Sequence, residues 1–265
     1  MPARSAHPVP ARALLRLLAS CGLVVALAGC PARPDADARV AVAANFTGVA
    51  RELAADYAQE SGHTIRISSG STGMLQAQVR NGAPFDLLLA ADAATPRQLV
   101  SDHLADGASL HDYAIGRLVL WAPDRDLSSD GEKMLRHESL ERMAIANPAL
   151  APYGVGARET LQHVGRWDAL QARLLVGENA SQATQFVASG ASPQGLLPRS
   201  LVLELVRQGK EGTPWLVPAE WHAPIVQTAV LLHHGRGNTA AIGFLRYLRG
   251  ERARARIREA GYDSP

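Results

Sequence analysis

The first third of the chain alternates between short apolar runs and helical patterns, and this alternation is the strongest constraint on its fold. Residues 39–45 ("RVAVAAN") and 63–69 ("HTIRISS") have the composition of strands, while residues 46–63 and 72–82 carry apolar side chains at helical spacing. Residues 85–92 ("FDLLLAAD") form a continuous apolar run, which is typical of a strand buried on both faces. This order predicts an α/β fold with a mostly parallel sheet flanked by helices.

A second unit of the same kind is predicted to begin near residue 117, and the end of the chain returns to the first. The final segments predict a strand over residues 223–234 and a pair of helices over 238–261 that breaks near Gly250. Within the second unit, the patterns predict strands in residues 113–123, 143–148 and 172–179 and helices in residues 153–167 and 180–190.

The N-terminus has the features of an export signal. Arg12 and Arg16 precede an apolar run over residues 17–28, which is too short to span a bilayer but suits the core of a signal peptide. The run ends in "LAGC", which resembles the lipobox of bacterial lipoproteins, so residues 1–29 are predicted to be removed and Cys30 to be lipidated. The alternative is an ordinary signal peptide that ends near a chance cysteine.

Composition limits the function classes. Cys21 lies within the predicted signal, so the mature chain keeps only Cys30 and has no partner for an intramolecular disulfide. With 47% hydrophobic residues, the chain must take its stability from an apolar core. The net charge is +2, and the arginines of residues 246–258 alternate with other residues as on a solvated helix, without interleaved aromatics. We therefore expect no nucleic-acid partner.

Four turns that follow predicted strands are polar but almost uncharged. They are "AANFTG" at 43–48, "SSGSTG" at 68–73, "NPALAPYG" at 147–154 and "GENASQ" at 177–182, and Glu178 is their only charged residue. Each turn leads into a helix, whose first N–H groups lack intrahelical partners and can bind an anion. If the turns converge, they form a cage of neutral donors. The alternative is that their polar side chains are only helix N-caps.

Enzyme signatures are scarce in this sequence. There is no Gly-x-Ser-x-Gly elbow, and the "GSTG" turn lacks the lysine of a phosphate-binding loop. The adjacent His233 and His234 have no carboxylate at ligand spacing, so no metal cation site is expected. An exported enzyme that uses Asp86, Asp92 or His163 is one alternative, although Asp92 is better placed to cap the helix that follows it. A purely structural lipoprotein is another.

With these segments in view, the chain resembles the molybdate-binding proteins of bacterial ABC importers, which are periplasmic type II solute-binding proteins. The resemblance extends from about residue 39 to residue 262. Its most specific parts are the turns "AANFTG" and "SSGSTG", the run "NGAPFDLLLAAD", the segments "YAIGRLVLWAP" and "IANPALAPYG", and the closing "EAGYDSP".

The resemblance implies which residues hold the ligand. In that family a tetrahedral oxyanion is buried between two lobes by hydroxyl, amide and backbone N–H donors. Carried over by position, the ligand-binding residues are Asn45, Thr72, Tyr153 and Ala180, of which the last two act through backbone N–H groups. Ser71 and Ala44 are additional candidates. Some relatives also supply a tyrosine hydroxyl at a position that is Pro198 here, and proline has nothing to donate.

The resemblance also implies an architecture and a role. The expected fold is two α/β lobes, each a mostly parallel sheet flanked by helices, with the ligand in the cleft between them. The expected boundaries are a signal peptide at 1–29, a linker at 30–38, lobe 1 at 39–116 and 225–265, and lobe 2 at 117–224. The chain would be a monomer without catalysis or cofactor, held by its lipid anchor on the periplasmic side of a bacterial membrane, and would deliver its ligand to a membrane permease.

The identity of the anion is the main alternative within this fold. Molybdate is expected, and tungstate should bind similarly because the two ions are nearly equal in size and charge. A receptor for sulfate or phosphate would use a cage of different size. A phosphate receptor also benefits from a carboxylate that accepts the proton of the monobasic ion, and the predicted turns offer none.

Overall fold

The computed structural model describes residues 36–265 except 138, 139 and 141. The predicted signal peptide, Cys30 and residues 31–35 of the predicted linker lie outside these residues. Among the helices of this described part, none is long and apolar enough to cross a membrane.

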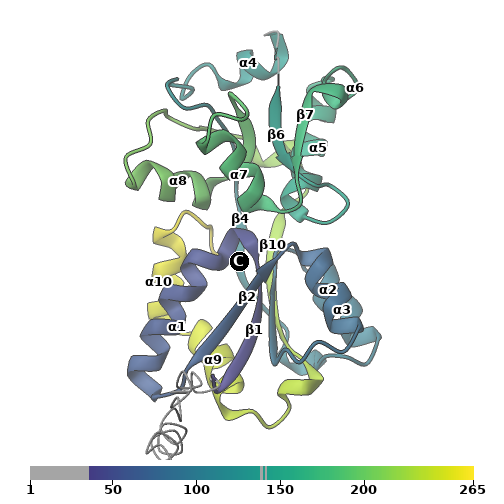
Figure 1. Cartoon of the computed structure of the whole chain (residues 1–265), viewed down its shortest axis with the longest axis vertical. Helices are drawn as coiled ribbons and strands as arrows, with labels where there is room; N and C mark the ends of the chain where they lie inside the picture. Colours follow the sequence, from purple (N-terminus) through teal and green to yellow (C-terminus); the bar gives the residue numbers. More distant parts are fainter. Residues whose placement is uncertain (1–35, 138–139, 141) are drawn as a thin grey trace, which may run out of the picture. The chain divides into compact units, whose positions relative to one another are not determined.

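The first sheet has five strands, and four of them run in the same direction. Its order is β2-β1-β3-β10-β4, with β10 antiparallel to both of its neighbours. This sheet and its helices are called lobe 1 (Figure 1). The strands are β1 (Ala38–Ala43), β2 (Ile65–Gly70), β3 (Leu87–Ala90), β4 (His111–Gly116) and β10 (Ile225–Leu231).

The second sheet repeats this plan with shorter strands. Its order is β7-β6-β8-β5-β9, and β5 is the strand that runs antiparallel to its neighbours. This sheet and its helices are called lobe 2 and lie in the upper half of Figure 1. The strands are β5 (Leu118–Trp121), β6 (Met143–Ala146), β7 (Leu174–Gly177), β8 (Gly195–Pro198) and β9 (Trp215–Leu216). The expected α/β fold with two mostly parallel sheets is confirmed.

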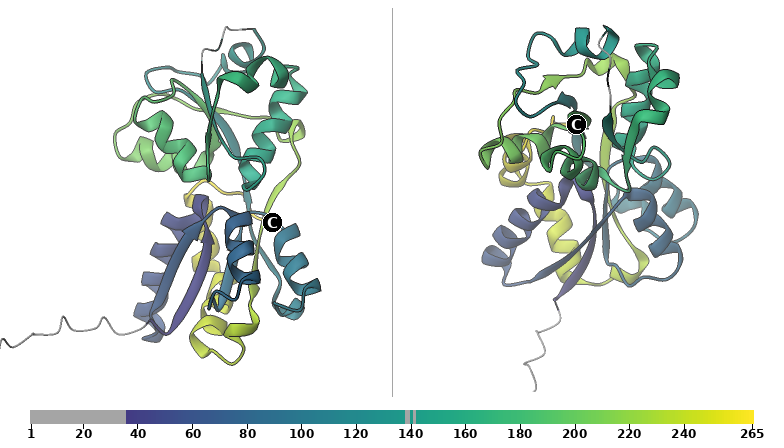
Figure 2. Two further views of the ribbon diagram at one scale, coloured as in Figure 1. Left: turned by 45° about the vertical axis from the view of Figure 1, so that its right-hand side comes forward. Right: turned by 45° about the horizontal axis from the view of Figure 1, so that its top comes forward.

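Helices cover both faces of each sheet, as the apolar runs require (Figures 1 and 2). In β3, Leu87 and Leu89 pack with the helices α1, α9 and α10, whereas Leu88 and Ala90 pack with α2 and α3. The strand is therefore buried on both faces, as its composition predicted. Lobe 1 contains α1 (Thr47–Ser61), α2 (Thr72–Arg80), α3 (Ala94–Ser101), α9 (Thr239–Leu248) and α10 (Glu251–Glu259); lobe 2 contains α4 (Gly131–His137), α5 (Pro152–His163), α6 (Trp167–Leu170), α7 (Ala180–Ala188) and α8 (Arg199–Arg207).

The chain crosses between the sheets twice. The segment 113–123, which the sequence predicts as one strand, is two strands in different sheets, β4 and β5, separated by Arg117. The chain returns to lobe 1 between Leu216 and Ile225. The C-terminal segment supports the first crossing, because Asp263 exchanges backbone hydrogen bonds with Ile115 and its carboxylate lies 2.7 Å from Nη1 of Arg117.

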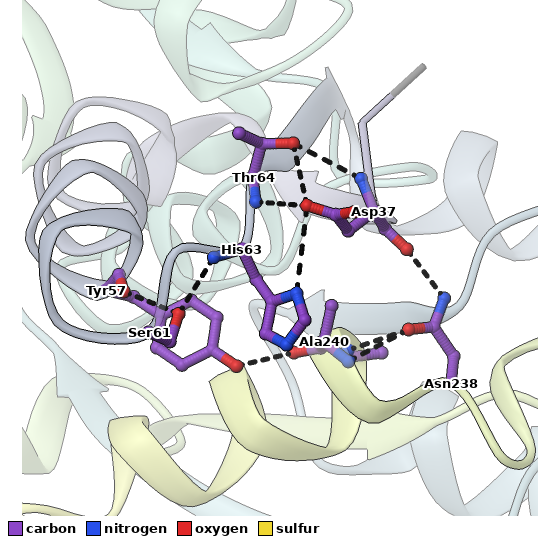
Figure 3. A network of polar contacts seen from close by, with 8 residues as sticks. Asp37, Tyr57, Ser61, His63, Thr64, Asn238 and Ala240 are labelled. Atoms are coloured by element: carbon purple, nitrogen blue, oxygen red, sulfur yellow. Dashed lines mark hydrogen bonds and ion pairs between the residues drawn. The ribbon is translucent and has the colours of Figure 1, made fainter. Parts of the chain in front are cut away.

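Polar contacts fasten the amino end of β1 to the rest of lobe 1 (Figure 3). One carboxylate oxygen of Asp37 accepts a hydrogen bond from the Thr64 N–H at 2.7 Å, which lowers the pKa of Asp37. The Asp37 carbonyl accepts another from the side chain of Asn238, which also caps α9 through the N–H groups of Ala240 and Ala241. The described chain therefore begins at the edge of lobe 1 that lies opposite the carboxyl ends of β1, β2 and β3.

We predict that Phe244 is a main contributor to the stability of lobe 1. Its side chain is fully buried between α9 and the sheet, so Phe244→Ala should lower the free energy of unfolding by about 3–5 kcal/mol. Ile242 lies on the same helix but is 36% exposed, and Ile242→Ala should cost only about 0.5–1 kcal/mol. Urea unfolding monitored by circular dichroism measures both values, and equal losses would contradict this view of the core.

Candidate functional site

The polar turns that follow the strands converge on one small cavity. It lies where the carboxyl ends of β1 and β3 and the start of α2 in lobe 1 meet the starts of α5 and α7 in lobe 2. The cavity is small, with a volume of about 10 Å³, which is room for about one water-sized group. The cavity is lined by Ala43, Ala44, Asn45, Ser71, Thr72, Ala91, Ala151, Pro152, Tyr153, Asn179 and Ala180.

The cavity brings together all six residues that the sequence analysis names as ligand-binding. Ala44, Asn45, Ser71 and Thr72 belong to lobe 1, and Tyr153 and Ala180 belong to lobe 2. Pro198, which stands where some relatives have a tyrosine, ends β8 and is not among the lining residues. The binding of a ligand by these six residues is a proposal.

None of the residues that line this cavity carries a charged side chain. Its polar groups are the first N–H groups of helices together with hydroxyl and amide side chains. Thr72 and Ala180 each occupy the first position of their helix, and Tyr153 follows Pro152 at the start of α5. Early N–H groups have no intrahelical acceptor, and the helix dipole adds partial positive charge there. The site therefore favours an anion without holding a cation.

Local side-chain contacts fix these helix starts. The hydroxyl of Ser71 caps α2 by accepting from the Met74 N–H at 3.4 Å, and Asn179 caps α7 by accepting from the Gln182 N–H at 3.0 Å. The hydroxyl of Thr72 accepts a hydrogen bond from the Ala91 N–H at 3.1 Å. A hydroxyl that accepts one bond still has its own proton to give. The hydroxyls of Ser71 and Thr72 thus each keep a proton that can be donated to a ligand.

The side chain of Asn45 bonds to other residues of the protein, although its position in the first turn suggests that it binds the ligand. Its side-chain Nδ2 lies 3.0 Å from Oε1 of Gln227 and 3.1 Å from the hydroxyl of Tyr262, so both amide protons are committed within the protein. The Asn45 carbonyl accepts from the same Tyr262 hydroxyl at 2.8 Å. The group of Asn45 that remains for an anion is its backbone N–H, while its side chain positions the turn.

Asn45 is part of a buried network centred on Gln227, which is fully buried in β10. Oε1 of Gln227 lies 3.0 Å from the Tyr113 hydroxyl, and its Nε2 donates to the Tyr153 hydroxyl at 3.2 Å. Because Tyr153 belongs to lobe 2, these contacts join the two walls of the cavity. This Gln227 network consists of Asn45, Tyr113, Tyr153, Ser200, Gln227 and Tyr262.

Burial keeps the tyrosines of this network neutral. Desolvation raises the pKa of Tyr113 and of Tyr153 well above the ordinary value, and it also raises the pKa of Tyr262. In Tyr262, hydrogen bonds from Ser200 and Asn45 oppose this rise only in part. A neutral hydroxyl both donates and accepts, whereas a phenolate beside the cavity would repel an anion.

A larger outer cleft of about 450 Å³ adjoins the small cavity, with which it shares Ala91, Ala151 and Pro152. Unlike the cavity, it carries two carboxylates, those of Asp92 and Glu159. Asp92 accepts from the Thr95 N–H at 2.6 Å and so caps α3, which confirms the role expected from the sequence. Burial raises the pKa of Asp92, and the bonds from Thr95 partly offset that rise.

The residues considered for an exported enzyme make structural contacts in separate parts of the fold. Asp86 is buried and accepts from the Arg39 N–H at 2.7 Å, and its other oxygen lies 2.9 Å from Nδ1 of His234. His163 stacks on Trp221 with ring centroids 4.8 Å apart. In the described part of the chain, no three His, Cys, Asp or Glu side chains are grouped to hold a metal ion.

Sequence reasoning missed several members of the site region, among them Gln227 and Tyr262. Gln227 has a recognisable signal, because it is a large polar side chain within the apolar run of residues 225–231, where a buried amide needs partners. Tyr262 lies in the closing "EAGYDSP" segment, but nothing in that segment indicates a contact with Asn45, which is 217 positions away.

Comparisons with known proteins agree on one family. Residues 38–263 match the family of bacterial extracellular solute-binding proteins. The chain is 40% identical to the molybdate-binding protein ModA of Rhodobacter capsulatus over 84% of this chain and 86% of that protein, and 37% identical to ModA of Azotobacter vinelandii over 94% and 97%. The structure of the Azotobacter vinelandii periplasmic molybdate-binding protein superimposes with a TM-score of 0.81 at 35% identity, covering 86% of this chain and 99% of that one.

We predict that stability falls at alkaline pH because of the buried tyrosines. Above about pH 10 the unfolded chain releases tyrosine protons that the folded protein keeps, so the free energy of unfolding decreases as pH rises. Tyr113→Phe removes one such proton and should make this decrease less steep. Urea unfolding at several values between about pH 9 and about pH 11 measures the slope, and the same slope in both proteins would contradict the assignment.

Proposed function

Because the chain belongs to the family of bacterial extracellular solute-binding proteins, we propose that it is the substrate-binding component of a molybdate ABC importer. The observation that carries this proposal is the uncharged cavity at which helix starts from both lobes meet. The chain is similar to two molybdate-binding proteins over 84% and 94% of its length. The family is one of receptors and not of enzymes, so the protein binds its ligand without turnover.

Neutral donors suit this ligand for a physical reason. Hydrogen bonds to an ion contribute roughly 1.5–3 kcal/mol each, so several converging N–H and O–H groups offset the cost of desolvating a divalent oxyanion. Here the donors are the backbone N–H groups of Asn45, Tyr153 and Ala180 and the hydroxyl and N–H of Thr72. They are held by helix starts, so the cage has a fixed size and selects among anions by fit.

Both lobes contribute to the cage, so closure of the lobes completes it. Ser181, at the start of α7, donates from its hydroxyl to the carbonyl of Ala44 at 3.0 Å across the cleft. The Gln227 network provides a second connection, through Tyr153. An anion held by donors from both lobes stabilises the closed form, which is the form that a permease of the importer recognises.

Tungstate is proposed as a second ligand, because it matches molybdate in charge and nearly in size. Sulfate and phosphate are the alternatives. The absence of any carboxylate among the cavity-lining residues argues against the monobasic form of phosphate, which needs an acceptor for its proton. Sulfate is a smaller anion, and a cage built for molybdate would hold it with longer, weaker hydrogen bonds.

The proposed location is the periplasmic side of a bacterial membrane. Export would use the signal at residues 1–29, and Cys30 would carry the lipid. The first described residues support this arrangement, because Asp37 lies at the edge of lobe 1 that is opposite the cavity. A tether that leaves there keeps the cleft free for a permease. The protein acts as a monomer, since each copy holds a complete cavity.

Thermal unfolding of the domain that starts at Pro31 tests the proposed ligand. With molybdate or tungstate at a thousandfold excess over Kd, ligand binding should stabilise the folded state by about 4 kcal/mol and raise the Tm clearly. Sulfate and phosphate at equal concentration should give little change. An equal rise with sulfate or phosphate would overturn molybdate as the selective ligand, and no rise with any anion would overturn the receptor function.

The Thr72 hydroxyl is predicted to contribute directly to binding. Thr72→Val keeps the shape but removes the hydroxyl, so the Kd for molybdate should rise by roughly 10- to 100-fold, as expected for one lost hydrogen bond to an ion. Thr72→Ser retains the hydroxyl and should remain within about threefold of the wild type. Isothermal titration measures all three proteins, and wild-type affinity in Thr72→Val would remove Thr72 from the site. Asn45→Ala is a poorer test, because it also breaks the Gln227 network.

A further inference from the structure

A backbone hydrogen bond joins the two lobes beside the cavity. The N–H of Gly73, the second residue of α2 in lobe 1, donates to the carbonyl of Leu150 in lobe 2 at 2.9 Å. Each partner adjoins a lining residue, Thr72 on one side and Ala151 on the other. The length of this hydrogen bond therefore affects the distance between the two cavity walls that a bound anion must contact.

A side chain at Gly73 would be crowded in this arrangement. A Cβ added there would lie 3.2 Å from the carbonyl oxygen of Leu150 and 3.3 Å from its Cα. Both distances are shorter than ordinary van der Waals contact, and both involve backbone atoms. Alanine at this position would therefore need the lobes or the Leu150 backbone to move apart by a few tenths of an ångström.

Leu150 has little freedom to yield to such a side chain. It belongs to a tight turn in which the N–H groups of Leu150 and Ala151 both donate to the carbonyl of Asn147, at 3.1 and 2.9 Å. The side-chain oxygen of Asn147 accepts from the Ala149 N–H at 2.9 Å. The backbone N–H of Asn147 donates to the carbonyl of Gly177 at 2.7 Å. An obstruction at Gly73 would move the lobes apart more readily than it would move this turn.

The local structure of α2 gives no other reason for glycine here. Gly73 lies within the helix and is not among the glycines with positive φ, so alanine is compatible with its backbone. Glycine inside a helix is less favourable than alanine, because it loses more conformational freedom on folding. The helix itself would be more stable with alanine at this position.

We infer that Gly73 is a positioning residue that sets the distance at which the lobes close, and hence the size of the anion cage. This inference rests on the proposed function, because it assigns Gly73 a role in anion binding and none in folding. The glycine allows the α2 start to meet the Leu150 carbonyl, which brings the Thr72 donors within range of the donors from α5 and α7.

The chain offers a matched control in α1, which also begins with Thr-Gly. Gly48 is the second residue of α1, as Gly73 is of α2, and it also faces lobe 2. A Cβ added at Gly48 would lie 3.2 Å from Oε2 of Glu204, but that oxygen is the far end of an exposed, flexible side chain. Gly48→Ala and Gly73→Ala therefore make the same change in the same helix position against a movable and a fixed neighbour.

The experiment compares wild type, Gly73→Ala and Gly48→Ala by isothermal titration with molybdate and by thermal unfolding without ligand. Gly73→Ala should raise the Kd by roughly 5- to 100-fold, the range expected for overpacking, while its ligand-free Tm is unchanged or higher. Gly48→Ala should bind within about threefold of wild type. These results together distinguish an effect on lobe closure from an effect on folding. If the fold needed this glycine, its replacement would lower the ligand-free Tm.

Three results would overturn the inference. Wild-type affinity in Gly73→Ala would show that the lobes close equally well with a side chain there. A lowered ligand-free Tm in Gly73→Ala would assign the glycine to folding, and equal losses of affinity in both variants would show no special role for the Leu150 contact. If wild-type protein itself fails to bind molybdate, the proposed function fails, and the role of Gly73 in it fails with it.

Discussion

The buried side-chain amide of Gln227 is the contact on which the geometry of the site depends. It accepts from Asn45 and Tyr113 and donates to Tyr153, at a point where the chain crosses from one sheet to the other. A buried amide without partners costs roughly 1–3 kcal/mol, so each partner is held in place by the need to satisfy the others. Two of these partners, Asn45 and Tyr153, are walls of the anion cavity.

The network explains how an uncharged site can be rigid. Lysine or arginine would bind an anion strongly but would hold it on a long, flexible stem. Here the donors are N–H groups at helix starts, and their positions are fixed by caps such as Ser71 and Asn179. Selectivity then follows from how closely the two lobes approach, which connects the chemistry of the cavity to the contact between Gly73 and Leu150.

The elements that the sequence predicts well are those with long, regular patterns. The strand at residues 85–92 and the broken helix pair around Gly250 are found as β3 and as α9 and α10. The strands β8 and β9 were not predicted, because they span four and two residues and give almost no periodicity. The helix α8, which follows β8, was not predicted either. The division of residues 113–123 between two sheets was also missed, although Gly116 and Arg117 interrupt the apolar run at that point.

By itself, the sequence determined the α/β class, the four neutral turns and the helix starts that follow them, because these depend on neighbours in the chain. It also indicated six of the residues that line the cavity, through resemblance to a family whose turns have the same order. Only the tertiary structure decided that these turns meet, that the Asn45 side chain points to Gln227 and Tyr262, and that Gly73 touches Leu150. The physical reason is that such contacts join residues 77 to 217 positions apart, and packing of the two sheets, which no local pattern encodes, brings them together.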